Sequence, residues 1–217
     1  MGNRATGDLW DSFWAEHASS DRVFHRLLWR IRFLFSRAYA RRLLAAADGN
    51  PPARLLEVGC GSARTLHYLN ERLPASTGYA LDKSPEAIKI VRQISPGFIC
   101  TVSDAGTLPM KCGTFDVTFS IGLIEHFERS VAAQMVCEMV RVTRPQGLVA
   151  VMVPWRNSFY NLVRNVFGPR WPFGHEQPFT RPEITRFMVG QGLRAVQVHT
   201  IYGSTLLAIG RTPEGGR

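Results

Sequence analysis

The 217-residue sequence predicts an α/β fold, with a mostly parallel seven-stranded sheet and helices on both faces. Three observations predict this fold. From residue 54 onward, short apolar runs alternate with segments of helical periodicity. The runs are apolar throughout, as in strands that are buried on both faces. The last two runs lie a few residues apart, so they are expected to pair antiparallel and to make the final strand the antiparallel one.

The individual elements follow in chain order. Strands are expected at 54–58, 77–81, 97–102, 115–120, 148–153, 194–200 and 205–210. Helices are expected at 63–73, 85–94, 129–142 and 181–191. Ser84 precedes a proline and is a good N-cap for the second of these helices. The run 144–147, Arg-Pro-Gln-Gly, predicts a turn between a helix and the next strand.

The first fifty residues have a different character from the rest. Residues 1–50 are expected to form a helical appendage, and residues 51–217 the main domain with an aromatic insert at 154–180. Within the appendage, 21–47 predicts a basic amphipathic helix that begins at Asp21 and has no acidic residue from 22 to 47. This pattern is typical of a helix that packs on a domain with its arginines in water. The same pattern occurs in helices that lie on anionic membranes, a second and rarer reading.

The amino-acid composition indicates which class of protein this is. Hydrophobic residues make up 45% and charged residues 20%, as in an ordinary globular domain. The formal net charge is +9, and much of the excess lies in the basic helix. The four cysteines show neither a CxxC pair nor a Cys/His metal spacing, so we expect reduced thiols and no metal. Without a signal-peptide pattern or a long apolar run, a cytoplasmic location is expected, with membrane association through the 21–47 helix as an alternative.

A glycine-rich turn is the most informative feature of the chain. The first predicted strand ends in Glu57-Val58-Gly59-Cys60-Gly61, followed by the small residues Ser62 and Ala63. Such a strand-to-helix turn lets the backbone approach a ligand closely. Asp82 follows the second strand and Asp104 the third, while Phe115-Asp116-Val117 opens the fourth. In this order the motifs resemble those of class I S-adenosylmethionine-dependent methyltransferases, in particular the small-molecule, type 11-like members.

The resemblance implies a Rossmann-like fold, S-adenosylmethionine as the cofactor, and a set of binding residues at the strand ends. Asp82 would hold the ribose diol, Asp104 and the Ala105 N–H the adenine, and carbonyls at the end of the fourth strand the ammonium group. The full set implied for the cofactor is Glu57, Gly59, Cys60, Gly61, Asp82, Lys83, Asp104, Ala105, Ser120, Ile121 and Gly122. Ala63 stands where the family often has a third glycine. A nicotinamide-binding domain is disfavoured, because Arg64 interrupts G-x-G-x-x-G.

The acceptor side is less constrained by the sequence. His126, in Leu-Ile-Glu-His-Phe, follows the fourth strand and is a candidate general base, although a helix-capping or loop role is equally compatible. His175 and Glu176 are weaker candidates from the insert. The candidate acceptor-binding residues are aromatic side chains of the insert, which would form a lid: Trp155, Tyr160, Trp171 and Phe173. Trp10, Trp14 and Trp29 would close the other side.

The acceptor is therefore expected to be a small molecule, fairly hydrophobic and apolar or aromatic, with the oligomeric state left open. Two alternatives stay open beside it. An RNA methyltransferase would explain the charge, but the Asn/Asp-Pro-Pro-Tyr-like run of amino-methylating enzymes is replaced here by Ser120-Ile121-Gly122-Leu123, so nucleic acid is the less favoured partner. The other is a non-catalytic membrane-surface or scaffolding protein that retains the fold.

Overall fold

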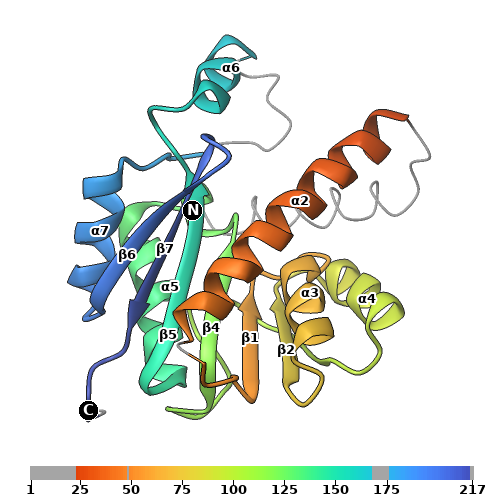
Figure 1. Cartoon of the computed structure of the whole chain (residues 1–217), viewed down its shortest axis with the longest axis vertical. Helices are drawn as coiled ribbons and strands as arrows, with labels where there is room; N and C mark the ends of the chain where they lie inside the picture. The colour runs from red at the N-terminus through yellow and green to blue at the C-terminus, as the bar shows by residue number, and fades with distance from the viewer. Residues whose placement is uncertain (1–22, 48, 168–175, 216–217) are drawn as a thin grey trace.

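The computed structural model describes residues 23–47, 49–167 and 176–215, and these form a seven-stranded mixed sheet (Figure 1). The strand order is β3-β2-β1-β4-β5-β7-β6, and β7 runs antiparallel to both of its neighbours. The strands are β1 (Arg54–Val58), β2 (Thr77–Asp82), β3 (Ile99–Val102), β4 (Phe115–Ile121), β5 (Thr143–Pro154), β6 (Arg194–Ile201) and β7 (Thr205–Arg211). The predicted fold class is confirmed, including the antiparallel final strand.

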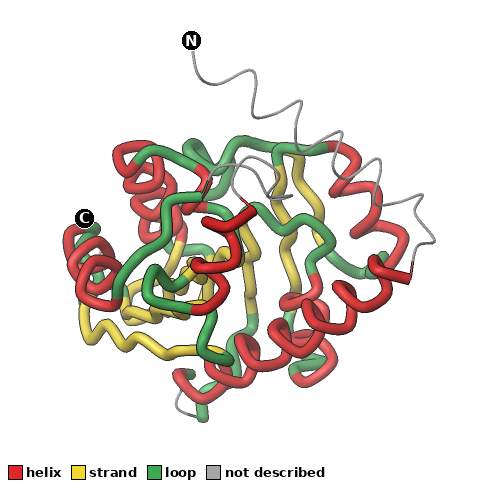
Figure 2. The backbone as a smooth tube through the Cα atoms, turned by 90° about the horizontal axis from the view of Figure 1, so that it is seen from above, coloured by secondary structure: helices red, strands yellow, loops and turns green. Residues whose placement is uncertain are grey.

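Helices cover both faces of the sheet (Figure 2). The described helices are α2 (Val23–Ala46), α3 (Arg64–Arg72), α4 (Pro85–Ile94), η1 (Ile124–His126), α5 (Arg129–Val142), α6 (Phe159–Phe167) and α7 (Arg181–Gly190). One apolar core joins the sheet to α5 and α7 through residues such as Met135 and Met188. The other core joins the opposite face to α2, α3 and α4 through residues such as Leu43, Leu66 and Ile88. Strands buried on both faces explain the uninterrupted apolar runs in the sequence.

Local sequence signals fix where the helices begin. The Ser84 side chain accepts a hydrogen bond from the Ala87 N–H at 3.3 Å, which confirms the predicted N-cap of α4. Helix α7 begins with a capping box, in which Thr180 accepts from the Glu183 N–H and the Glu183 carboxylate accepts from the Thr180 N–H. Both helices carry proline in the first turn, where its missing N–H costs nothing.

The expected turn at 144–147 is an irregularity inside β5 rather than a turn before it. The ladder with β4 pairs Thr143 with Phe115 and resumes only at Leu148, opposite Val117. Gln146 has φ +60°, a conformation that carries the chain outward between the two paired segments. Because pairing continues on both sides, the strand runs from Thr143 to Pro154. The turn signal was real, but sheet pairing on either side of it extended the strand.

Helix α2 is the described part of the expected basic helix, and its C-terminal half belongs to the core. Tyr39, Ala40 and Leu43 are buried, and the Tyr39 hydroxyl lies 3.0 Å from the Thr205 Oγ1 on β7. Asp21, the expected cap, lies outside the described residues. Within the described ranges, none of the helices combines the length and the apolar character that crossing a membrane requires.

Candidate functional site at the carboxyl edge of the sheet

The glycine-rich turn lies between β1 and α3, at the carboxyl edge of the sheet. Gly59, Gly61 and Ala63 all have positive φ, at +64°, +50° and +49°. A Cβ on Gly59 would lie 2.8 Å from the Leu123 Cδ1, so this side chain would have to shift, and the positive φ disfavours any other residue as well. The left-handed conformation of Ala63 costs roughly 1–2 kcal/mol relative to glycine. The turn therefore stores strain at the place where the backbone was expected to approach a ligand.

Asp82 ties this turn to the end of β2. Its Oδ2 accepts a hydrogen bond from the Gly61 N–H at 2.8 Å, and its Oδ1 accepts from the Ser84 N–H at 2.9 Å. The carboxylate thus stands between the tips of two neighbouring parallel strands, where ligands of open α/β sheets bind. Asp82 therefore lies at the end of β2 beside the glycine-rich turn, and its ribose-binding role stays a prediction.

Glu57 has a structural role that the sequence did not reveal. Its side chain is buried, and its Oε2 accepts a hydrogen bond from the Leu66 N–H in the first turn of α3 at 3.1 Å. Ala63, the N-cap residue of α3, has no side-chain oxygen that could accept such a bond. The carboxylate from β1 therefore caps α3 and opposes the positive end of its dipole.

Asp104 lies at the end of β3 and is held ionised. A hydrogen bond from the Gly106 N–H at 2.8 Å, together with the Lys83 ammonium at 3.1 Å, lowers the pKa of this carboxyl. Both side chains are about half exposed, so the ion pair itself contributes little to stability. Ala105 is buried beside it. An ionised acceptor at this edge fits the amino group of an adenine ring.

The end of β4 lies at the same carboxyl edge of the sheet as the residues described above. Gly122 has φ +74°, and its N–H donates to the Met152 carbonyl oxygen at 3.3 Å. The Ser120 Oγ is buried, and within the described residues it has no hydrogen-bond partner. Cys60 is also buried, and burial, with Asp82 and Glu57 nearby, raises the pKa of its thiol well above the ordinary value. The thiol stays neutral, so Cys60 contributes packing and backbone rather than a nucleophile.

These groups fit S-adenosylmethionine. The edge offers carboxylates, carbonyl oxygens and an orphaned buried hydroxyl for a ligand that carries an ammonium, a sulfonium and a ribose diol. Its basic side chain, Lys83, is paired with Asp104. These carboxylate and carbonyl oxygens suit a pyrophosphate poorly, since a pyrophosphate needs N–H groups and positive charge.

Three side chains gather beside the tip of β4. Glu125, His126 and Glu176 each bring one oxygen or nitrogen within 4.8 Å of the other two. Glu125 and Glu176 are buried and His126 is half-buried. Burial raises the pKa of Glu125 to about 8, and the nearby Glu176 adds to the shift. The sequence pointed to His126 and Glu176; Glu125 was missed, although it lies in the same Leu-Ile-Glu-His-Phe segment.

The expected acceptor-binding residues are only partly described. Trp155 is half-buried and packs against the core, and its backbone N–H donates to the Ser204 carbonyl oxygen at 3.0 Å. Five of the expected residues lie outside the described ranges: Trp10, Trp14, Trp171, Phe173 and His175. For Tyr160 and Trp29 the structure describes the backbone but not the side chain. Their roles stay predictions.

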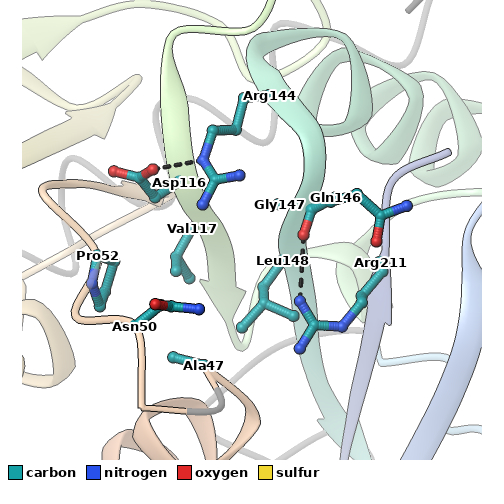
Figure 3. A pocket seen from close by; sticks show the side chains of 10 residues that line it. All are labelled: Ala47, Asn50, Pro52, Asp116, Val117, Arg144, Gln146, Gly147, Leu148 and Arg211. Carbon is teal, nitrogen blue, oxygen red and sulfur yellow. Dashed lines mark hydrogen bonds and ion pairs between the residues drawn. The ribbon is translucent and has the colours of Figure 1, made fainter. Parts of the chain in front are cut away.

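A separate hollow of about 390 Å³ lies at the opposite edge of the sheet (Figure 3). Its side chains are occupied with one another: Asp116 pairs with Arg144 and accepts from the Ala53 and Arg54 N–H groups. Arg211 donates to the Gln146 carbonyl oxygen at 3.1 Å. Ligands of open parallel sheets bind at the carboxyl edge instead, so we assign this hollow a structural role.

Comparison with known proteins agrees with the geometry. Residues 55–147 match the family model described as a methyltransferase domain. The malonyl-[acyl-carrier protein] O-methyltransferase of Serratia marcescens is 29% identical over 113 residues, covering 52% of this chain and 43% of that protein. The demethylmenaquinone methyltransferase of Streptomyces griseus is 30% identical over 119 residues, covering 54% and 49%. The chain thus spans less than half the length of these two relatives.

The fold likeness extends over nearly the whole chain. The magnesium protoporphyrin IX methyltransferase from Synechocystis, solved with bound S-adenosylhomocysteine, superposes with a TM-score of 0.71. The match covers 97% of this chain and 95% of that one at 13% sequence identity. The human N-acetylserotonin methyltransferase, solved with S-adenosylmethionine, superposes with a TM-score of 0.66 over 84% of this chain and 56% of that one, at 15% identity. The chain therefore shares the fold of these methyltransferases, and its residues 55–147 match a methyltransferase domain.

Proposed function

We propose that this protein transfers a methyl group from S-adenosylmethionine to a small, fairly hydrophobic acceptor. The observation that supports this best is the junction of Asp82 with Gly61, which brings a carboxylate against the glycine-rich turn at the carboxyl edge. The Asp104–Lys83 pair and Gly122, with its positive φ at the end of β4, extend the same edge. The relatives share the domain but are named for different acceptors, so the acceptor has to be inferred from this chain.

Methyl transfer requires the protein mainly to position the acceptor against the cofactor. When bound, S-adenosylmethionine supplies an already activated methyl group. Asp82, Asp104 and the carbonyls at the end of β4 would hold the cofactor, while the residues of the acceptor side bring the nucleophile into line. Orientation of this kind can contribute several powers of ten to the rate.

Helix α6 supports an apolar acceptor. It follows β5 at the carboxyl edge and extends beyond the sheet, as does the N-terminal half of α2 (Figure 1). Three of its apolar side chains are largely exposed: Phe159 at 76%, Leu162 at 59% and Val166 at 78%. An exposed apolar face next to a cofactor site is typical of a surface that covers a hydrophobic ligand.

His126 is the proposed proton acceptor. It lies one short helix beyond the tip of β4, with two buried carboxyl groups nearby. A base is required only when the acceptor is a hydroxyl or a protonated amine. Its proximity to the cofactor edge is what supports a catalytic role over a purely structural one.

We further propose a cytoplasmic protein that approaches anionic membranes peripherally through α2. Phe33 and Leu34 are 43% and 52% exposed there, and Arg41 and Arg42, about two turns further along the helix, are exposed as well. Vesicles that contain anionic lipid should bind the chain, and added salt should weaken this binding. A steep salt dependence with RNA and none with vesicles would instead favour the RNA methyltransferase alternative.

The test of the proposed function is product identification. The chain is incubated with S-adenosylmethionine labelled in its methyl group and a fractionated metabolite extract, and labelled products are identified by mass. A labelled small apolar product, absent with the Asp82→Ala variant, supports the proposal. Label in RNA contradicts the small-molecule acceptor. Cofactor binding without any product contradicts the enzymatic function and favours a scaffold that retains the fold.

A further inference from the structure

The cluster of Glu125, His126 and Glu176 contains an unexplained buried oxygen. Their three ligand atoms lie within 4.8 Å of one another. The Glu125 Oε2 has no hydrogen-bond partner within the described part of the chain, although this residue is only 2% exposed. Buried polar atoms are almost always paired, so an orphaned carboxylate oxygen points to a group that is bound there.

We propose that Glu125, His126 and Glu176 form a binding site for one divalent first-row metal ion such as Mn²⁺ or Zn²⁺. Two carboxylates and one imidazole form the mixed oxygen and nitrogen set that these ions accept. Around an ion with ligand bonds near 2.1 Å, neighbouring ligand atoms lie roughly 3–3.5 Å apart. The observed spacing needs only a modest inward rotation of the side chains.

The backbone holds the two ligand-bearing segments together. The Gln177 N–H donates to the Glu125 carbonyl oxygen at 2.7 Å, which joins the segment after α6 to η1. Arg164 of α6 donates to the Glu176 carbonyl oxygen at 2.7 Å. Ligands that are about fifty positions apart in the sequence are thus brought together by main-chain contacts, which limits the entropy that an ion would have to offset.

Positively charged side chains near the cluster should weaken its binding of a metal ion. The Arg164 Nη1 lies 3.7 Å from the Glu176 Oε2, so an ion would compete with this ion pair for the carboxylate. The Arg129 guanidinium stacks on the Phe179 ring at 3.4 Å and donates to the Gln177 and Pro178 carbonyl oxygens. We therefore expect micromolar rather than nanomolar affinity.

The proposed metal site lies beside the carboxyl edge of the sheet, where the cofactor is expected to bind. A Cβ on Gly122 would lie 3.6 Å from the Glu125 Oε1. Three protein ligands leave coordination positions open, and an acceptor that offers an oxygen could occupy one of them. With the ion bound, His126 is a ligand, so the ion rather than the imidazole would activate that oxygen; His126 is the proton acceptor only in the metal-free chain. This last consequence, an oxygen-bearing acceptor, rests on the proposed function, whereas binding of the ion does not.

The test titrates the chelator-treated, untagged full chain with Mn²⁺ and follows the loss of the free-ion signal by electron paramagnetic resonance. We expect saturation at one Mn²⁺ per chain. Glu125→Gln and Glu176→Gln should each weaken binding at least tenfold. Both replacements keep the side-chain shape, and melting curves verify that the variants are folded.

Glu71→Gln is the matched control, because Glu71 pairs with His67 at 3.4 Å on the exposed surface of α3 and should not matter. No saturable binding of Mn²⁺, or binding that survives in Glu125→Gln, Glu176→Gln and a third variant, His126→Ala, would overturn the proposal. Calorimetry with S-adenosylmethionine on the same samples separates this result from a failure of the proposed function. The two ligands are measured independently.

Discussion

Glu57 Oε2 accepts a hydrogen bond from the Leu66 N–H at 3.1 Å, so a carboxylate at the end of β1 caps the helix that follows it. The glycine-rich turn lies between these two residues. The contact therefore fixes the geometry of the turn as well as the start of α3. A residue expected to contact the cofactor also holds the frame of the site.

Glu57→Gln removes the charge but keeps the size of the side chain. We expect the free energy of unfolding to fall by about 1–2 kcal/mol, because the glutamine oxygen can still accept from the Leu66 N–H but no longer carries the negative charge that opposes the helix dipole. Urea denaturation measures the change. Glu86→Gln is the control, since Glu86 lies in the first turn of α4 with an exposed Lys89 partner. Equal small losses in both variants would refute the capping role.

Gly59→Ala tests the close approach of Leu123. The added methyl group would meet the Leu123 side chain at 2.8 Å, and the positive φ disfavours alanine as well. We expect a loss of stability of about 2 kcal/mol. In the double variant with Leu123→Ala, the steric part should be relieved, giving a coupling of about 1 kcal/mol between the two sites. Strict additivity in thermal or urea unfolding would show that the two residues do not touch.

Glu125→Gln should change how stability depends on pH in chelator-treated protein. Burial raises the pKa of Glu125 from 4.5 to about 8 in the folded state, so the fold prefers the neutral acid. Below pH 4.5 both folded and unfolded chains carry the proton, and nothing is lost. As the pH rises from there to 8, the unfolded chain ionises first and the folded chain loses stability.

The glutamine variant cannot ionise, so this loss should disappear. We expect the variant to be more stable than the native chain above pH 8 by on the order of 4 kcal/mol, and equal to it near pH 4. Urea unfolding across this pH range gives the comparison. A constant difference between the two proteins at every pH would mean that Glu125 ionises normally.

His126→Ala should lower turnover much more than cofactor affinity. With the acceptor found by labelling, we expect kcat of the chelator-treated, metal-free chain to fall about 100-fold or more, the usual size of a lost general base. The Kd for S-adenosylmethionine should stay within about twofold. His67→Ala is the control, because His67 lies on α3 and contacts Ser95 and Glu71 away from the strand ends. Equal losses of kcat and affinity in His126→Ala would indicate a structural role.

Much of the fold could be predicted from the sequence because local signals agreed with the sheet. Ser84 and the apolar runs of β1, β2 and β4 fixed their elements directly. At 144–147 the local turn signal competed with pairing on both sides, and only the ladder shows that β5 continues through it. Long-range pairing of this kind has no signature within one short window of sequence.

The features of the candidate site likewise divide into those that the sequence predicts and those that only the structure shows. The glycine turn and Asp82 were predictable, because both come directly after strands and share one edge of a parallel sheet. The capping role of Glu57 depends on which face of β1 carries α3. The gathering of Glu125 with Glu176 depends on a main-chain contact between segments about fifty residues apart, the Gln177 N–H to the Glu125 carbonyl oxygen. No local pattern encodes that contact.

The central claim is that Asp82 at the glycine-rich turn binds S-adenosylmethionine, and calorimetric titration tests it most directly. Asp116→Ala is the matched control: Asp116 also accepts two backbone hydrogen bonds, from Ala53 and Arg54, but at the opposite edge of the sheet. We predict saturable binding to the native chain and to Asp116→Ala, and at least tenfold weaker binding to Asp82→Ala. Absence of binding to the native chain, or equal affinity in all three proteins, would contradict the account.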